Sequence, residues 1–400
     1  MISKNGKINR TDNYRWLILL LCYLSVMLFA FAFQSIPPLV DLIRRDLGFS
    51  FTEIGLLMSF FALPGIFLTI PAGMSSDRYG ILPVAMASII TVTVGTIVVI
   101  LSNGFILFAI GRAISGLGAI VLTILAAQLL TKWFIEKDLG LAMGIYSTAF
   151  PLGTIAAFNI FGLIGENFGW KLPIYFVLFF SLFILIFFMI IFKEPPSLGA
   201  KEKDNDSIKS FKNIFTTNRS ILYVGITWLT FNAAFISLLT FGPDFLVSRG
   251  FDPVSADSIS SSLMWGAVIL SPLIGRFIDK SQAKELMIIS GNLLLIIIFL
   301  LIPSSGISLI PLFVVLGFAA ALVPVNVYSL PADIIESRSL GLGFGIITTC
   351  LNIGIVLGPL LIGFSRDRSG SFTFSFSLMA IFSLLSAAST YIVLRRRKNV

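Results

Sequence analysis

Long apolar stretches alternate with short polar segments along the whole chain. Each stretch holds about 20 mostly apolar residues, which is the length that a helix needs to cross the roughly 30 Å hydrocarbon core of a membrane. Strands of a membrane barrel would be about 10 residues long with alternating polarity, whereas these stretches are longer and continuous. The pattern predicts an all-α protein with twelve membrane-spanning helices, at 16–38, 54–73, 82–101, 105–131, 140–163, 172–192, 220–246, 258–278, 286–302, 307–330, 341–364 and 372–394.

Composition supports a membrane environment. Hydrophobic residues make up 56% of the 400 residues and charged residues 12%, against roughly 45–50% and about 25% in soluble domains. The mean hydropathy is +0.98. The net charge of +8 would suit a nucleic acid only if the basic residues formed one patch on a soluble surface, and here they lie between the apolar stretches. We therefore expect a lipid bilayer as the surroundings and no nucleic-acid partner.

The residue types also limit the chemistry. The chain has no histidine, and its two cysteines, Cys22 and Cys350, lie inside apolar stretches. Histidine and cysteine are the usual protein ligands of zinc, haem and iron–sulfur clusters. We expect no metal, no cofactor and no enzymatic activity.

Lysine and arginine are distributed unevenly between the two sides that the predicted helices define. Twenty-one of the 28 fall on the side that holds both termini and six on the other, and Arg112 falls inside a helix. Loops rich in lysine and arginine stay in the cytoplasm. The distribution predicts a multi-pass protein of the plasma membrane (the inner membrane of a bacterial cell) with both termini cytoplasmic.

The two halves of the chain repeat one another. The segment 139–145 matches 340–346 at an offset of 201 residues, and 73–78 matches 275–280 at an offset of 202. Two six-helix bundles of equal orientation can rock about a central site, which is the architecture of many transporters. The expected divisions are a cytoplasmic N-terminus (1–15), a first bundle (16–192), a cytoplasmic linker (193–219), a second bundle (220–394) and a basic tail (395–400).

Two motifs resemble those of the major facilitator superfamily. The loop after the second helix has Gly73, Asp77, Arg78 and Gly80 of the pattern G-x-x-x-D-R-x-G-R-R, although Ile81 and Leu82 replace its final basic pair; the fourth helix has R-x-x-x-G-x-G at Arg112, Gly116 and Gly118. The resemblance implies two pseudo-symmetric bundles and rocker-switch alternating access. It assigns gating, rather than solute binding, to the first motif and its second-half copy, namely Gly73, Asp77, Arg78, Gly80, Gly275, Asp279 and Lys280.

Arg112 is the one charge predicted well inside a helix. An arginine at the centre of a membrane helix costs roughly 2.5–3.5 kcal/mol on insertion scales, so it should face protein or water. Small residues share its helix face, including Ser115, Gly116 and Ala119. Two interpretations stay open: a guanidinium that pairs with an anionic solute, or a structural arginine bonded to neighbouring helices.

Other polar and aromatic residues in the predicted helices are candidates for solute contact. Amides among them can equally bond across helices, for about 0.6 kcal/mol. The candidates are Gln34, Trp228, Asn232, Trp265, Asn326, Tyr328 and Asn352. Four prolines mark expected bends, at Pro64, Pro151, Pro324 and Pro359.

Together these features predict a monomeric secondary transporter for a small solute, with an organic anion or another polar metabolite favoured by Arg112. Two alternatives are an efflux antiporter for hydrophobic or cationic compounds and a transporter-like sensor or scaffold. A proton is the candidate coupling ion, although Glu53 and Asp244 lie near the ends of their helices rather than in the middle. Substrate identity, direction of transport and coupling stay open.

Overall fold

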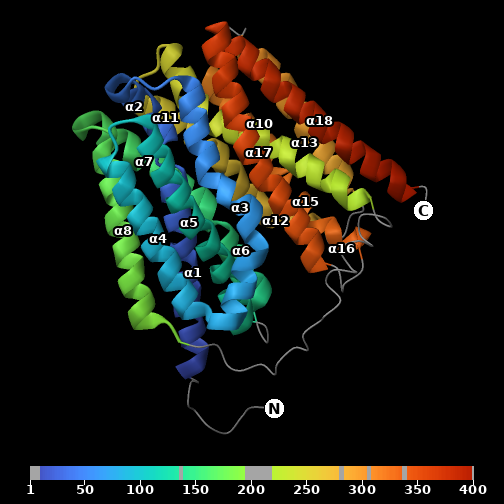
Figure 1. Ribbon diagram of the computed structural model, residues 1–400. Helices are drawn as coiled ribbons and strands as arrows, with labels where there is room; N and C mark the ends of the chain where they lie inside the picture. Colours follow the sequence, from blue (N-terminus) through green and yellow to red (C-terminus); the bar gives the residue numbers. More distant parts are fainter. Residues whose placement is uncertain are drawn as a thin grey trace.

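The computed structural model describes residues 10–134, 138–193, 219–278, 283–303, 308–335 and 340–398, and within these ranges every regular element is a helix. Figure 1 shows two groups of helices. The first, blue to green, comprises α1 (Arg10–Phe33), η1 (Pro37–Leu39), α2 (Val40–Leu47), α3 (Phe51–Tyr79), α4 (Ile81–Leu101), α5 (Phe105–Phe134), α6 (Leu139–Ser147), α7 (Ala149–Phe168) and α8 (Lys171–Ile191). The second, yellow to red, comprises α10 (Ser220–Ser248), α11 (Pro253–Ser261), α12 (Leu263–Ile278), α13 (Lys284–Leu301), α14 (Leu309–Ala321), α15 (Pro324–Ser329), α16 (Pro331–Ile334), α17 (Leu340–Ser369) and α18 (Phe372–Lys398).

The twelve-helix prediction is confirmed. Within the described ranges, eleven helical segments are long and apolar enough to cross a membrane. The eighth crossing is divided between α11, with 9 residues, and α12, with 16, so neither part reaches the required length alone. Together they cover the predicted 258–278 and begin five residues earlier.

Prolines end or divide some helices and leave others continuous. Helix α1 stops at Phe33, before the predicted end at 38, because Pro37 and Pro38 follow and have no N–H to donate. The fifth crossing is divided at Thr148, just before Pro151, and the tenth at 322–323, just before Pro324. Helices α3 and α17 run through Pro64 and Pro359 without a break.

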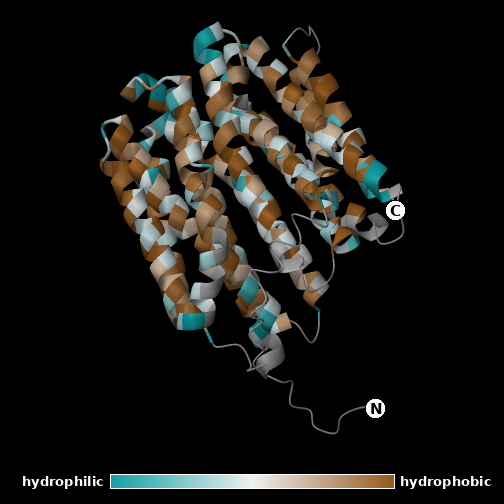
Figure 2. Ribbon diagram, turned by 45° about the vertical axis from the view of Figure 1, so that its right-hand side comes forward, coloured by the Kyte–Doolittle hydropathy of each residue, from teal (hydrophilic) through white to brown (hydrophobic). Residues whose placement is uncertain are grey.

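The lipid-facing surface is apolar. Figure 2 shows hydrophobic residues along the middle of the helices and hydrophilic residues mainly toward their ends. Ile106, Ile190 and Phe67 are 76%, 75% and 71% exposed. Large apolar side chains at such exposure suit contact with lipid rather than water.

The two groups of helices meet through α3 against α17 and through α7 against α11. We call the end that holds α2, the start of α3, the α10–α11 turn and the α17–α18 turn the closed end, and the opposite end, where α1 begins and α18 finishes, the terminal end. In Figure 1 the two groups lie together at the closed end and diverge toward the terminal end. The predicted linker, apart from its two ends, lies outside the described residues.

Candidate functional site

Arg112 lies on α5, where its side chain contacts α1 and α3, and is 2% exposed. Its guanidinium also lies over the Phe61 ring, 4.4 Å from the ring centroid. A guanidinium has five N–H donors, and each is within reach of a protein acceptor. The acceptors are Leu57 O at 3.2 Å from Nε, Ala32 O at 2.5 Å and Ser35 Oγ at 3.3 Å from Nη1, and Phe33 O at 3.1 Å and Met58 Sδ at 3.8 Å from Nη2.

The sequence explains why α1 needs this partner. Phe33 is the last residue of α1. In a continuing helix its carbonyl would accept a hydrogen bond from the N–H of residue 37, but residue 37 is a proline and has no N–H. Arg112 supplies the missing donor and places a positive charge at the C-terminal, electronegative end of the helix. Among the described residues, the hydrogen-bond acceptors of the guanidinium are carbonyl, hydroxyl and thioether atoms, and none is a carboxylate. Arg112 therefore joins α1, α3 and α5 and remains a net positive charge in the membrane interior.

The structure brings some of the predicted polar residues together and separates others. Trp228 and Tyr328 meet edge to face, with ring centroids 5.4 Å apart, and the Asn232 amide donates to the Trp228 carbonyl at 2.7 Å. Phe344 extends the cluster at 6.5 Å from Tyr328. Tyr328 is 40% exposed, whereas Trp228 and Asn232 are buried. This aromatic and amide cluster, formed by α10, α15 and α17, has two accessible rings, those of Tyr328 and Phe344.

The remaining candidates lie in separate contacts. Gln34 donates to Thr154 Oγ1 at 3.4 Å, Asn326 donates to Leu322 O at 2.7 Å, and Asn352 donates to Thr348 O at 2.9 Å. The Asn352 amide lies against Gly65 of α3, so it reaches the other group of helices. Trp265 on α12 is 46% exposed. Two buried candidate atoms have no hydrogen-bond partner among the described residues: Gln34 Oε1 and Asn326 Oδ1.

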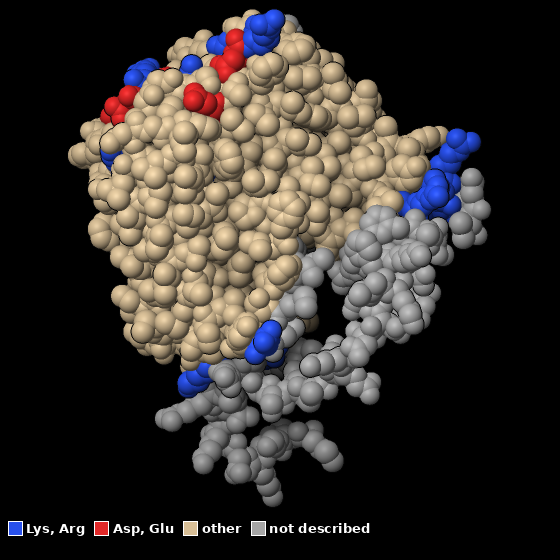
Figure 3. Space-filling view, viewed as in Figure 1, with Lys and Arg blue, Asp and Glu red and all other residues tan. Residues whose placement is uncertain are grey.

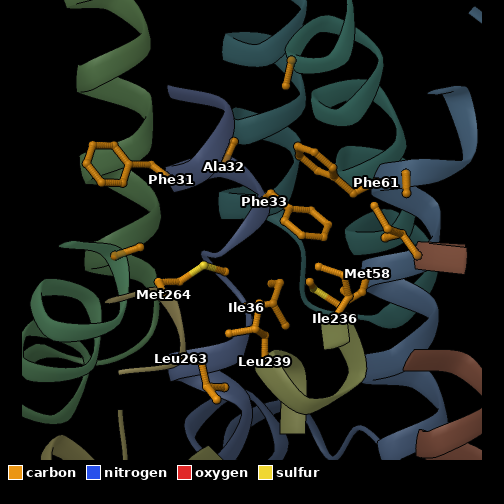
Figure 4. Packing of buried hydrophobic residues seen from close by; sticks show 14 of the residues in the cluster. Phe31, Ala32, Phe33, Ile36, Met58, Phe61, Ile236, Leu239, Leu263 and Met264 are labelled. Atoms are coloured by element: carbon orange, nitrogen blue, oxygen red, sulfur yellow. The ribbon is translucent and has the colours of Figure 1, made fainter. Parts of the chain in front are cut away.

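An apolar layer joins the two groups of helices near Arg112. In Figure 4, Phe33, Ile36 and Met58 of the first group face Ile236, Leu239 and Met264 of the second, and all belong to one buried cluster. Each of these six side chains is at most 5% exposed. The layer has no polar side-chain atom that would bind water, so it seals the interior on the side of the closed end.

Polar contacts cross between the groups beyond this layer. Asp367, near the end of α17, accepts hydrogen bonds from Phe51 N at 3.0 Å, Thr52 N at 2.7 Å and Thr52 Oγ1 at 2.5 Å. The carboxylate thus caps the positive N-terminus of α3 from the other group. Ser59 Oγ donates to Val356 O at 2.5 Å, and Arg44 lies 3.9 Å from Asp244.

The terminal end has a different arrangement. Arg15 pairs with Asp138 at 2.8 Å inside the first group, and Lys284 pairs with Asp333 at 2.7 Å inside the second. Arg397 pairs with Glu285 at 2.6 Å, also inside the second group. Figure 3 shows Lys and Arg at both ends of this face, Asp and Glu at the closed end, and neither kind across the broad middle.

The predicted gating residues lie toward the terminal end. Arg78 is exposed, 5.2 Å from the Tyr79 ring centroid, and Gly80 joins α3 to α4 with a φ of +87° that favours glycine. Gly73 and Asp77 belong to α3 and Gly275 to α12. Asp279 and Lys280 lie outside the described residues.

The sequence analysis missed Asp257 and Asp367. Asp257 is 2% exposed and lies in α11, one residue before the predicted eighth helix. The Asp252–Pro253 pair could have shown that Asp257 lies in a helix, because an aspartate N-cap followed by proline marks a helix start. Asp367 follows the last predicted residue of helix eleven by three positions, and its cross-group bonds have no sequence signal.

Comparison with known proteins gives relatives of one family with different solutes. The family model described as Major Facilitator Superfamily matches residues 22–259 and 249–400. The hexuronate transporter of Bacillus subtilis (strain 168) is 23% identical over 369 residues, which cover 86% of this chain and 87% of the relative. The lysosomal dipeptide transporter MFSD1 of Mus musculus is 22% identical over 398 residues, covering 94% and 85%.

A solved bacterial homolog of the human lysosomal transporter Spinster, in an inward-facing and occupied conformation, superposes with a TM-score of 0.78 at 17% identity, covering 96% of this chain and 97% of that one. This likeness agrees with the twelve-helix fold. The two solute types named among the relatives show that family membership alone does not fix what is carried. The match over most of the chain means that this protein is a transporter and not an enzyme, and that it belongs to the Major Facilitator Superfamily.

Proposed function

We propose that this protein carries a small organic anion across the plasma membrane by rocker-switch alternating access, with both termini in the cytoplasm. The moving units are the bundles at 16–192 and 220–394. In this proposal the closed end faces outward and the described conformation is inward-facing. The contrast between contacts that cross the bundles at one end and ion pairs that stay inside each bundle at the other supports a conformation open toward the terminal end. The excess of Lys and Arg on the side of the termini supports a cytoplasmic position for that end.

The unpaired buried atoms favour a polar solute over a hydrophobic one. Gln34 Oε1 and Asn326 Oδ1 are acceptors, each without a partner among the described residues. Leaving such a group unpaired costs about 1–3 kcal/mol. Trp228 and Tyr328 form the cluster whose Tyr328 ring is accessible. A solute with hydroxyl groups can donate hydrogen bonds to both acceptors.

The charge of Arg112 is the observation that carries the preference for an anion. Its five donors are occupied, so it acts through its field rather than through a direct bond to the solute. A charge whose described acceptors include no carboxylate, in a low-dielectric interior, attracts an anion over several ångströms. The hexuronate carrier among the relatives moves an anion of this class, which agrees with the proposal.

Solute counterflow tests this proposal without any assumption about coupling. Proteoliposomes holding the purified protein are loaded with unlabelled glucuronate, and the entry of labelled glucuronate is compared with that of labelled glucose in glucose-loaded vesicles. We expect glucuronate to be favoured at least about tenfold, which corresponds to about 1.4 kcal/mol. Arg112→Lys keeps the charge and should keep the preference. Equal entry of labelled glucose would exclude an anion carrier. Counterflow of a lipophilic cation, with none of glucuronate, would favour the efflux antiporter.

A further inference from the structure

Asp257 is a buried carboxyl group at the interface between the two groups of helices. It lies on α11, which packs against α7, and it is 2% exposed. Its Oδ2 has no hydrogen-bond partner among the described residues. The side chain fits only because position 162 on α7 is glycine, since a Cβ there would overlap Asp257 Oδ2. The carboxyl group is therefore held directly against the main chain of the opposite bundle.

No positive side chain compensates Asp257 from the described elements around it. The charged group that α7 contributes is Glu166, which is exposed, and the one that α10 contributes is Asp244, which lies 3.9 Å from Arg44. On α11 itself, Asp252 caps the helix by accepting from Ser255 N. Helix α14 has no charged residue, and the single one of α12, Arg276, is two residues from the far end of that helix.

An ionised carboxylate in this place would be an unpaired buried charge, which costs several kcal/mol. A neutral carboxyl group avoids that cost. The surrounding contacts are suited to neutral groups: Asn159 of α7 donates to Ser261 Oγ at 3.1 Å and accepts from Ser258 Oγ at 2.7 Å, both on α11. These bonds join the bundles, so separation of the closed end breaks them and exposes Asp257 to water on that side.

We propose that Asp257 is a proton-binding site that must be filled before the closed end can close. In the open state the carboxylate takes one proton from the water at the closed end and becomes a neutral carboxyl group. The proton stays on Asp257 while α7 and α11 are in contact and returns to the same side when they separate. Acid on that side therefore favours closure, without net proton transport through this site.

This inference rests on the proposed alternating access, but not on the identity of the solute. Its test is a distance measurement in the absence of any solute. Spin labels are attached to Asn103→Cys and Arg368→Cys, two exposed positions at the closed end on opposite bundles, after Cys22 and Cys350 are replaced by serine. The full-length protein is titrated between pH 5 and pH 8, and the closed and open populations are read from the distance distribution.

Uptake of one proton on closure changes the closed-to-open ratio by up to tenfold per pH unit, with closure favoured at lower pH. We expect this slope in the parent protein and a flat profile in Asp257→Asn, which mimics the neutral carboxyl group. Asp252→Asn on the same helix is the matched control and should keep the slope, since asparagine also caps helices. If the asparagine variant does not fold, Asp257→Ser replaces it, and the same flat profile is expected.

Two results would overturn the proposal: a flat profile in the parent protein, or an unchanged slope in the Asp257 variants. Failure of glucuronate counterflow would leave these distances unaffected, so the two proposals fail separately.

Discussion

The two ends of the molecule use their polar residues differently. At the closed end, Asp367 and Ser59 form hydrogen bonds from one bundle to the other. At the terminal end, the ion pairs that the structure describes, such as Arg15 with Asp138, remain inside one bundle. Contacts inside a bundle are kept when the bundles rock, whereas contacts between bundles must be broken. Substitutions that remove contacts inside a bundle should lower the stability of the fold. Substitutions that remove contacts between the bundles should shift the equilibrium between open and closed states.

The largest effect on stability is expected at Arg112, whose bonds all lie inside the first bundle. Arg112→Ala removes five donors and leaves the buried Ala32, Phe33 and Leu57 carbonyls without them. We expect the free energy of unfolding to fall by about 3–5 kcal/mol, the range for a broken buried charged network. Chemical unfolding of the detergent-purified protein measures this loss.

Arg112→Lys is the matched control for that variant. Lysine keeps the charge but has three donors and no planar fork, so it should lose less stability than alanine. The spin-label distances at the closed end should remain those of the parent in both variants. A large opening of the closed end with an unchanged free energy of unfolding would show that Arg112 controls the contact between the bundles rather than the stability of one bundle.

The next largest effect is expected at Gly363 on α17, which lies against the Phe51 carbonyl of α3. A Cβ at this position would overlap that carbonyl, so Gly363→Ala must push the two bundles apart. Overpacking costs about 1–3 kcal/mol, and here the cost falls on the closed state alone. The open population in the distance measurement should rise about 5- to 150-fold.

Gly345→Ala on the same helix is the control, because a Cβ there meets open space. It should leave the distance distribution unchanged and, if anything, raise helix stability slightly. Equal distance distributions for the two variants would mean that the α3–α17 contact does not limit closure.

Helix positions could be read from the sequence because each crossing depends on local hydropathy and length. The predicted eleventh crossing at 341–364 lies inside α17, and the predicted fourth at 105–131 lies inside α5. The start of the eighth was placed five residues late because the polar segment around Asp257 resembles a loop by hydropathy. Its cap at Asp252 is the feature that extends the helix.

The contacts of the candidate site could not be predicted in the same way. The sequence indicated that Arg112 must face protein or water, but its acceptors are main-chain carbonyls 55 to 80 residues away. Every residue has such a carbonyl, so no residue type marks the partner. Asp367 illustrates the same limit, since it binds the start of α3 from more than 300 residues away. Such pairs are determined by how the bundles pack.

A moderate effect is expected when Asp367 is changed. Asp367→Asn removes the charge that faces the N-terminus of α3 but keeps one acceptor oxygen for Phe51 N or Thr52 N. Hydrogen bonds to charged groups contribute about 1.5–3 kcal/mol, and partial solvent exposure of this cap reduces that to about 1 kcal/mol. The open population should rise about fivefold, with little change in the free energy of unfolding. Loss of stability without opening would place Asp367 among the contacts that hold a bundle together.

The smallest effect is expected at Arg45, which tests whether a residue must bond across the bundles, and not merely lie at the closed end, to affect closure. Arg45 lies at the closed end but pairs with Asp41 of its own helix α2 at 2.6 Å, and its side chain is 69% exposed. Such i,i+4 pairs contribute about 0.3–0.5 kcal/mol. Arg45→Gln should therefore change the free energy of unfolding by no more than this amount and leave the spin-label distances as they are. Arg44→Gln, one residue earlier, removes a pair that crosses to Asp244 and should open the closed end measurably more. If the two variants opened it equally, charge at this end, rather than bonding between the bundles, would control closure.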